Sequence, residues 1–109
     1  IARYEKVFVE AARRLNLAVK TKNCKSIGST DAGNVSQVVP TIHPTIKICD
    51  EPVTLHTEAF KAAAHSQQAD QAIRDGAIIL SRIAVRLLME PDTLKEIKDD
   101  FSKVKQNLR

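Results

Sequence analysis

The sequence predicts an α/β fold, in which extended segments from the middle of the chain lie among helices from its two ends. Apolar residues recur at helical spacing near both ends, and β-branched residues are concentrated in the middle. The 109 residues include 17 Lys and Arg against 13 Asp and Glu, and 43% are hydrophobic. This ordinary globular composition excludes a disordered or low-complexity protein and fits one compact domain.

The first segment, from about Ala2 to Leu15, is expected to be an amphipathic helix that ends at Asn16. Its apolar residues recur every three or four positions, which leaves the charged residues on the other side. The apolar face holds Tyr4, Val7, Phe8, Ala11 and Leu15. A short strand over 17–19 is predicted to follow, and the small residues of 28–34 then indicate a loop.

Segments 35–39 and 41–49 are rich in β-branched residues and predict two strands. In the second segment three isoleucines share one parity, as a strand with one buried face requires. These residues are Ile42, Ile46 and Ile48. Pro40 and Pro44 cannot donate to a ladder, so this strand is expected at the edge of a sheet or irregular at its start.

Three helices are predicted in the last half of the chain. Residues 57–64 predict one or two turns with Phe60 inward, and a long helix follows from Gln67 to about Met89. Pro91 interrupts this helix, and Asp92 is expected to cap a final one. The predicted core stripes are Ala69, Ile73, Ala77, Leu80, Ile83, Ala84, Leu87 and Leu88 in the long helix, and Leu94, Ile97, Phe101, Val104 and Leu108 in the last.

Charge, hydropathy and cysteine usage limit the possible partners and the cellular compartment of the protein. The net charge of +4 allows anionic partners, but the basic residues are scattered and none of the four aromatics lies within a basic stretch, so nucleic-acid binding is not expected. No apolar run approaches the roughly 18 residues of a membrane span. Cys24 and Cys49 have no metal-ligand spacing and favour a reduced, cytoplasmic setting, with both thiols as small buried hydrophobes. Because the chain begins at Ile1 without a signal sequence, we expect a piece of a longer protein.

General motifs leave the function open. The 28–34 loop lacks the Gly-Lys-Ser/Thr of a phosphate-binding loop and the third glycine of a dinucleotide fingerprint, so a plain turn is favoured over a ligand site. The sequence has no HExxH motif, and no two of its three histidines share a helical face. A lone histidine such as His56 is more often structural or exposed than a metal ligand.

Two longer stretches resemble one enzyme family. The string from Gly28 to Pro44, GSTDAGNVSQVVPTIHP, and the string from Leu55 to Phe60, LHTEAF, look like zinc-dependent amidohydrolases. This family comprises aminoacylases, carboxypeptidase-type dipeptidases and aminobenzoyl-glutamate hydrolases, and the first string is typical of the last branch. The resemblance implies a partial mixed sheet flanked by helices, as the C-terminal half of a zinc-exopeptidase-like catalytic domain. The N-terminal half and a dimerising lid domain would then lie outside residues 1–109.

The resemblance also assigns roles to particular residues. It implies that His56 is a metal ligand, that Thr30, Asp31 and Asn34 line the substrate site, and that His43 is a further substrate-binding candidate. It implies two zinc ions, or manganese or cobalt in their place, and a catalytic Glu upstream of this chain. The remainder of the same protein, a small-molecule or peptide substrate, and a second subunit bound through the lid domain are the implied partners.

The predicted function is therefore one part of a two-metal amidohydrolase or peptidase. The complete protein would hydrolyse an amide bond of an N-acyl amino acid or small peptide, and the isolated chain is expected to be inactive. The alternative is a non-catalytic adaptor domain that binds partners through its amphipathic helices.

Overall fold

The computed structural model describes residues 2–20 and 30–107. These residues form five helices, joined by irregular segments and by a long extended segment, 40–54. The helices are α1 (Ala2–Arg13), α2 (Ala32–Val35), α3 (Glu58–Ala64), α4 (Gln67–Met89) and α5 (Pro91–Asn107). Within the described residues, no helix combines the length and the hydrophobicity that a membrane span requires.

The prediction of an α/β fold with a partial mixed sheet is wrong, because the described ranges contain helices and no strand. A ladder needs two extended segments that exchange backbone hydrogen bonds. The predicted strand over 41–49 does not form, because segment 40–54 bends at Asp50 and Glu51 and no other part of 2–20 or 30–107 pairs with it. The residues of 17–19 are irregular and form no strand either.

The predicted strand over 35–39 is also wrong, because turns use its backbone. Val35 is the last residue of α2, and its carbonyl accepts from the amides of Val38 at 3.0 Å and Val39 at 3.1 Å. A backbone that forms successive local turns cannot pair with a neighbouring strand at the same time. The β-branched composition of this segment is therefore overridden by local hydrogen bonding.

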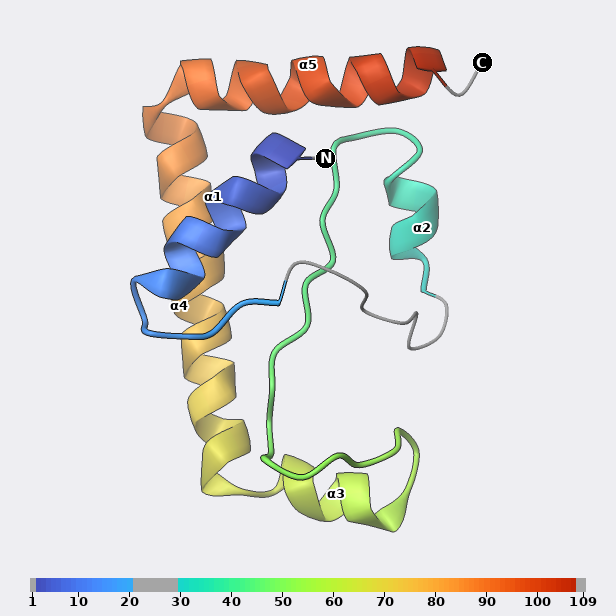
Figure 1. The fold of residues 1–109 in the computed structure, drawn as a ribbon, viewed down its shortest axis with the longest axis vertical. Helices are drawn as coiled ribbons and strands as arrows, with labels where there is room; N and C mark the ends of the chain where they lie inside the picture. Colours follow the sequence, from blue (N-terminus) through green and yellow to red (C-terminus); the bar gives the residue numbers. More distant parts are fainter. Residues whose placement is uncertain (1, 21–29, 108–109) are drawn as a thin grey trace.

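The core lies where α1, α4 and α5 meet (Figure 1). The long helix α4 carries α1 on one side, and α5 crosses its C-terminal end. We call these three helices the helical corner. Its buried cluster consists of Val7, Ala11, Ala12, Ile79, Ile83 and Ile97. The helices predicted at both ends of the sequence are thus confirmed.

The C-terminus of α1 is closed by a Schellman motif. The amide of Leu17 donates to the carbonyl of Ala12 at 3.2 Å, and the amide of Asn16 donates to that of Arg13 at 2.9 Å. Asn16 adopts a left-handed backbone with φ 59, the conformation that this motif requires at its turning residue. The end predicted at Asn16 is confirmed, and the motif brings Leu17 back onto the core.

Short polar residues begin α3 and α4. The side chain of Thr57 accepts from the amide of Phe60 at 3.2 Å, and that of Ser66 accepts from the amide of Ala69 at 3.1 Å. Helix α5 begins at Pro91, where the missing amide is tolerated. Asp92 therefore lies inside its first turn, and the prediction that Asp92 caps this helix is wrong.

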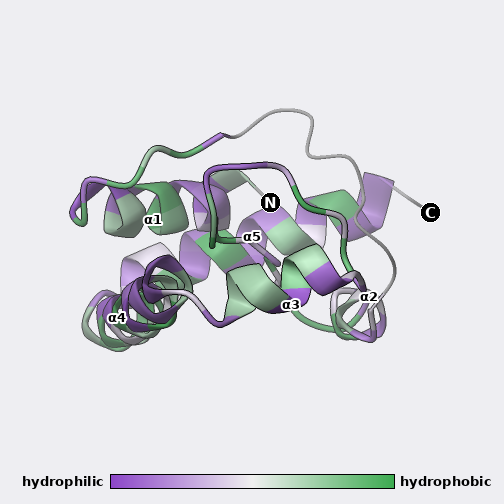
Figure 2. Ribbon diagram, turned by 90° about the horizontal axis from the view of Figure 1, so that it is seen from below, coloured by the Kyte–Doolittle hydropathy of each residue, from purple (hydrophilic) through white to green (hydrophobic). Residues whose placement is uncertain are grey.

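The predicted core stripe of α4 is only partly buried. Ala69 and Ile83 are buried and Leu87 is half-buried against the corner. The other five predicted core residues are exposed, and we call them the open stripe: Ile73, Ala77, Leu80, Ala84 and Leu88. In Figure 2, which views α4 nearly along its axis, hydrophobic residues are not confined to the side that faces α1.

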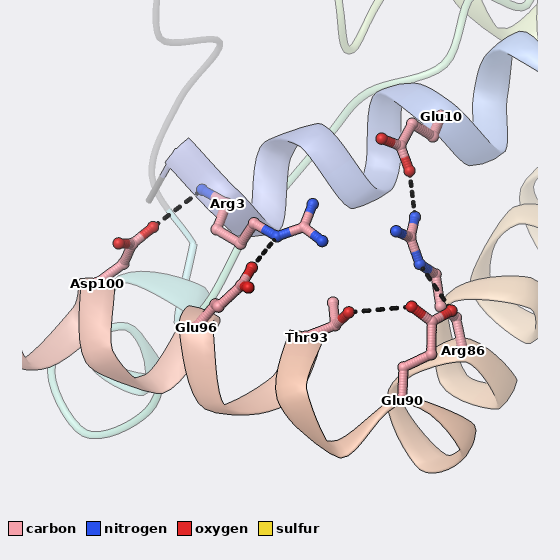
Figure 3. Close-up of polar contacts among 7 residues, drawn as sticks. All are labelled: Arg3, Glu10, Arg86, Glu90, Thr93, Glu96 and Asp100. Atoms are coloured by element: carbon pink, nitrogen blue, oxygen red, sulfur yellow. Dashed lines mark hydrogen bonds and ion pairs between the residues drawn. The ribbon is translucent and has the colours of Figure 1, made fainter.

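Ion pairs link the three helices at the edge of their core (Figure 3). Arg86 of α4 binds the carboxylates of Glu10 on α1 and Glu90 between α4 and α5. Arg3 of α1 pairs with Glu96 of α5. The hydrogen bond from Arg86 lowers the pKa of Glu10 and outweighs its slight desolvation, and the same bond raises the pKa of Arg86. These contacts therefore join all three helices beside the apolar core.

Candidate functional site

His56 lies in a tight turn that enters α3. The hydroxyl of Thr57 donates to the carbonyl of Thr54 at 2.6 Å and accepts from the amide of Phe60, so one side chain closes the turn and caps the helix. Between these anchors His56 has φ 62, a left-handed conformation that is uncommon for residues other than glycine. Its side chain is exposed. The turn therefore presents the imidazole of His56 at the surface, and the two hydrogen bonds of Thr57 hold the backbone around it.

The predicted substrate residues Thr30, Asp31 and Asn34 lie around the first turn of α2. The hydroxyl of Thr30 accepts from the amide of Ala32 at 3.3 Å, and the carbonyl of Asp31 accepts from the amide of Asn34 at 3.0 Å. Asp31 stands at the helix N-cap position, but its carboxylate makes no capping bond. All three side chains are exposed. Gly28, Ser29 and Cys24 lie outside the described residues.

The described chain does not bring the five predicted site residues together. His43 is exposed in the extended segment, between the α2 turn and the turn of His56. Figure 1 shows α2 and α3 near opposite ends of this segment. Within 2–20 and 30–107, α2 has no contact with another helix. A single site that contains all five residues remains a prediction.

Potential metal ligands are also dispersed. Among the described residues, no three His, Cys, Asp or Glu side chains come together in a group that could hold a metal ion. Cys49 is a free thiol whose Sγ lies 3.1 Å from the carbonyl oxygen of Glu51. Its side chain is half-buried, whereas the sequence predicted a buried one. A tight zinc site uses three or four protein ligands. His56 could therefore take part in such a site only with ligands from outside the described residues.

The structure shows an apolar groove that sequence reasoning missed. It lies between the extended segment, α3 and α4, and its volume is about 560 Å³. Its lining includes Ile46, Ile48, Phe60, Ile73 and Leu80, and it contains no charged residue. The shared parity of Ile46 and Ile48 was a usable signal, because it placed both on one side of the segment. The inward side of Phe60 was predicted correctly, since its half-buried ring lines this groove.

One side-chain hydrogen bond joins the extended segment to α4. Asp50 accepts from the ammonium of Lys47 at 3.2 Å and from the side-chain amide of Gln68 at 3.3 Å. The bond to Lys47, followed by the bond to Gln68, lowers the pKa of the Asp50 carboxyl. Because Gln68 belongs to the first turn of α4, this hydrogen bond joins the extended segment to α4.

Comparison with known proteins gives two similar proteins. A human Xaa-Arg dipeptidase is 35% identical over 99 residues, which cover 88% of this chain and 22% of that protein. The mouse Xaa-Arg dipeptidase is 39% identical over 74 residues, which cover 68% of this chain and 17% of that protein. The chain is similar to one stretch of a dipeptidase. It spans about a fifth of the length of these relatives.

The similarity supports the family resemblance at a coarse level. It supports a metallopeptidase-type family for this chain and does not single out the aminobenzoyl-glutamate hydrolase-like branch. No family model matches the chain. No solved structure matches it either. The specific substrate, the metal and the partners of the complete protein are therefore taken up as proposals.

Proposed function

We propose that this chain is the C-terminal portion of the catalytic domain of a metal-dependent amidohydrolase or peptidase. The complete protein would hydrolyse the amide bond of an N-acyl amino acid or small peptide, and its lid domain and N-terminal half would lie outside residues 1–109. The similarity to two dipeptidases supports this proposal. The observation that carries it is the exposed imidazole of His56, held on a left-handed backbone by Thr57.

The turn of His56 fits the role of one metal ligand. Strained backbone persists only where surrounding contacts hold it, and such positions are frequent at functional sites. Two divalent ions, when bound, would polarise the scissile carbonyl and lower the pKa of the attacking water. His56 would hold one of them as a neutral imidazole, and the fixed turn would keep its ring oriented.

Asp31 and Asn34 are proposed to position the substrate. Neither side chain is used as a helix cap or held in a hydrogen bond with another part of the described chain, and both are exposed. A carboxylate accepts hydrogen bonds, whereas a carboxamide can both donate and accept them, so together they can hold an amide-containing substrate. Dipeptides with arginine in the second position are the first substrates to test, because both relatives are named for them.

The test compares His56→Ala with His65→Ala in the longer protein that contains this chain. His56→Ala is expected to lower kcat/KM by about 1000-fold, or roughly 4 kcal/mol of transition-state stabilisation, with loss of bound metal and little change in the melting temperature of the metal-free protein. His65 ends α3 with its backbone, so His65→Ala retains that contact and serves as a matched control.

Equal metal content and turnover in the His56→Ala variant and the parent protein would show that His56 is not a ligand. A parent protein that hydrolyses no amide but binds another protein would support the adaptor alternative instead. Assays of the parent protein thus distinguish an enzyme from an adaptor. Assays of the His56→Ala variant test whether His56 is a metal ligand.

The isolated chain offers a second test of the divided metal site. Because one imidazole binds zinc weakly, residues 1–109 are expected to bind no stoichiometric zinc at micromolar concentration. Titration calorimetry measures this directly. One tightly bound zinc per chain would mean that the ligand set is complete within these residues and would contradict the proposal.

A further inference from the structure

We propose that a cleft between α1 and the C-terminal half of α4 binds a small carboxylate that carries an apolar chain. The volume of this cleft is about 530 Å³, within the range of about 300 to 1,000 Å³ that is usual for small-molecule sites. We call it the arginine cleft. It shares no residue with the apolar groove, and its charged lining residues are Glu10, Arg14, Arg82, Arg86 and Glu90. The proposal is independent of the proposed hydrolysis, because it uses only residues of the helical corner and Glu90.

Two of the three arginines in the cleft are available to an anion. Arg86 is already paired, because its guanidinium binds the carboxylates of both Glu10 and Glu90, as Figure 3 shows. With the other described residues, Arg14 and Arg82 form no ion pair. Three arginines against two glutamates leave the cleft with one net positive charge. Its electrostatics therefore favours an anionic ligand beside Arg14 and Arg82.

The helix dipoles account for only one of these two arginines. Arg14 follows the last residue of α1, where a cation interacts favourably with the negative end of the dipole. Arg82 lies about two turns before the end of α4, and the effect of the dipole falls off within the last turn. A guanidinium is weakly hydrated and can donate two parallel hydrogen bonds to one carboxylate. A carboxylate in the cleft would thus accept from an arginine of each helix.

The apolar lining of the cleft favours an organic anion over a free inorganic one. Val85 is 59% exposed and Met89 is 76% exposed, and both line the cleft beside the buried side chains of Val7 and Ala11. A ligand chain that covers them would gain up to about fourfold in affinity for each buried methylene group. Methionine is flexible and adapts to ligand chains of different shape. A carboxylate with a short alkyl chain therefore matches both parts of the lining.

Met89, the single methionine of the chain, allows binding to be measured inside the cleft by NMR. In residues 1–109 with isotope-labelled methionine methyl groups, the Met89 resonance is expected to shift on titration with hexanoate, with a dissociation constant of about 1 to 10 mM. Acetate, which lacks the apolar chain, should bind at least about ten times more weakly. Hexylammonium has the same chain with the opposite charge and should cause no saturable shift. In the longer protein, Met89→Leu identifies this resonance by its loss, and the same shifts are expected.

Substitution of the arginines tests their role directly. Arg14→Gln and Arg82→Gln are each expected to weaken hexanoate binding by about fivefold or more, with little change in the melting temperature, because both side chains are exposed. Arg74 is exposed on α4 outside the cleft, so Arg74→Gln is the matched control and should bind hexanoate as the parent does.

Three results would overturn the proposal. The first is the absence of a saturable Met89 shift with hexanoate. The second is equal hexanoate affinity in Arg82→Gln and the parent protein. The third is a shift with hexylammonium as large as that with hexanoate, which would show apolar adsorption without recognition of charge. Because none of these measurements uses hydrolysis, failure of the proposed enzyme function would leave them interpretable.

Discussion

The helical corner and the segment 30–57 differ in how each is held. Apolar residues from all three helices of the corner form a buried cluster, and ion pairs join these helices. In 30–57 the first residues form local turns, and no backbone hydrogen bond joins 40–54 to another part of the described chain. Every predicted site residue belongs to this second region. Stability and candidate chemistry are therefore concentrated in different parts of the sequence.

This separation predicts how changes in each region act. A segment with few buried contacts and exposed backbone opens at low free energy, whereas a packed core opens only with the whole fold. Substitutions of buried residues in the corner should thus change the free energy of unfolding. Substitutions in 30–57 should change activity in the longer protein and leave that free energy nearly unchanged.

The largest effect on stability is expected from Ile97→Ala. Ile97 is 1% exposed and lies in the core formed by the three helices. Deletion of its buried methylene and methyl groups should lower the free energy of unfolding by about 2 to 4 kcal/mol. Leu88→Ala is the matched control, because Leu88 is 82% exposed and should change stability by less than about 0.5 kcal/mol in the isolated chain. Urea denaturation measures both, and equal losses would show that the corner is not the main core.

The sequence allowed the helices to be predicted better than the rest. Helix α4 was predicted with its observed ends because its apolar residues are periodic from Gln67 to about Met89 and Pro91 follows them. The sheet could not be predicted correctly, because β-branched residues indicate an extended chain and not the presence of a pairing partner. The same holds for Ile73 and Leu80, whose periodicity marks an apolar face but not whether this chain covers it.

The candidate site was less accessible to prediction for a similar reason. The residue types of His56 and Asp31 were identified through a family resemblance, and the left-handed backbone of His56 gave no signal in the sequence. The groove was missed because it joins residues from the extended segment, α3 and α4. Contacts between distant segments depend on tertiary packing, which local patterns do not contain.

A smaller effect on activity is expected from Asp31→Ala and Asn34→Ala in the longer protein. If these side chains position the substrate, each variant should lower kcat/KM by about tenfold, which corresponds to roughly 1.4 kcal/mol, with no loss of metal. The melting temperature should not change, because both side chains are exposed. Steady-state kinetics measure the change in kcat/KM, and metal analysis measures the metal content of each variant. Unchanged kinetics in both variants would leave this turn with a structural role only.

The Schellman motif of α1 tests the corner through the backbone. Asn16→Val should lower the free energy of unfolding by about 1 to 2 kcal/mol, because a β-branched residue is strained at φ 59. Asn16→Gly is the control and should be neutral or slightly stabilising, since glycine adopts this conformation freely. Thermal unfolding of both variants measures the difference. Equal stability would mean that this turn does not limit the packing of Leu17 on the core.

The smallest effect concerns the ion pair between Glu10 and Arg86, and it depends on pH. The pKa of Glu10 is lowered in the folded protein from its ordinary value of 4.5, chiefly by the hydrogen bond from Arg86. The folded state thus favours the charged carboxylate. The stabilisation from this ion pair is fully present above the ordinary pKa of Glu10 and is lost as the pH falls through its lower pKa in the folded state. Because the side chain of Glu10 is 53% exposed, Glu10→Gln should lower stability at neutral pH by only about 0.2 to 1 kcal/mol.

Near pH 3 the difference in stability between Glu10→Gln and the parent protein should shrink, whereas Glu58→Gln on exposed α3 should have little effect at either pH. Urea denaturation at both pH values measures this, and a Glu10→Gln effect that stays constant on acidification would show that charge at this pair does not stabilise the corner.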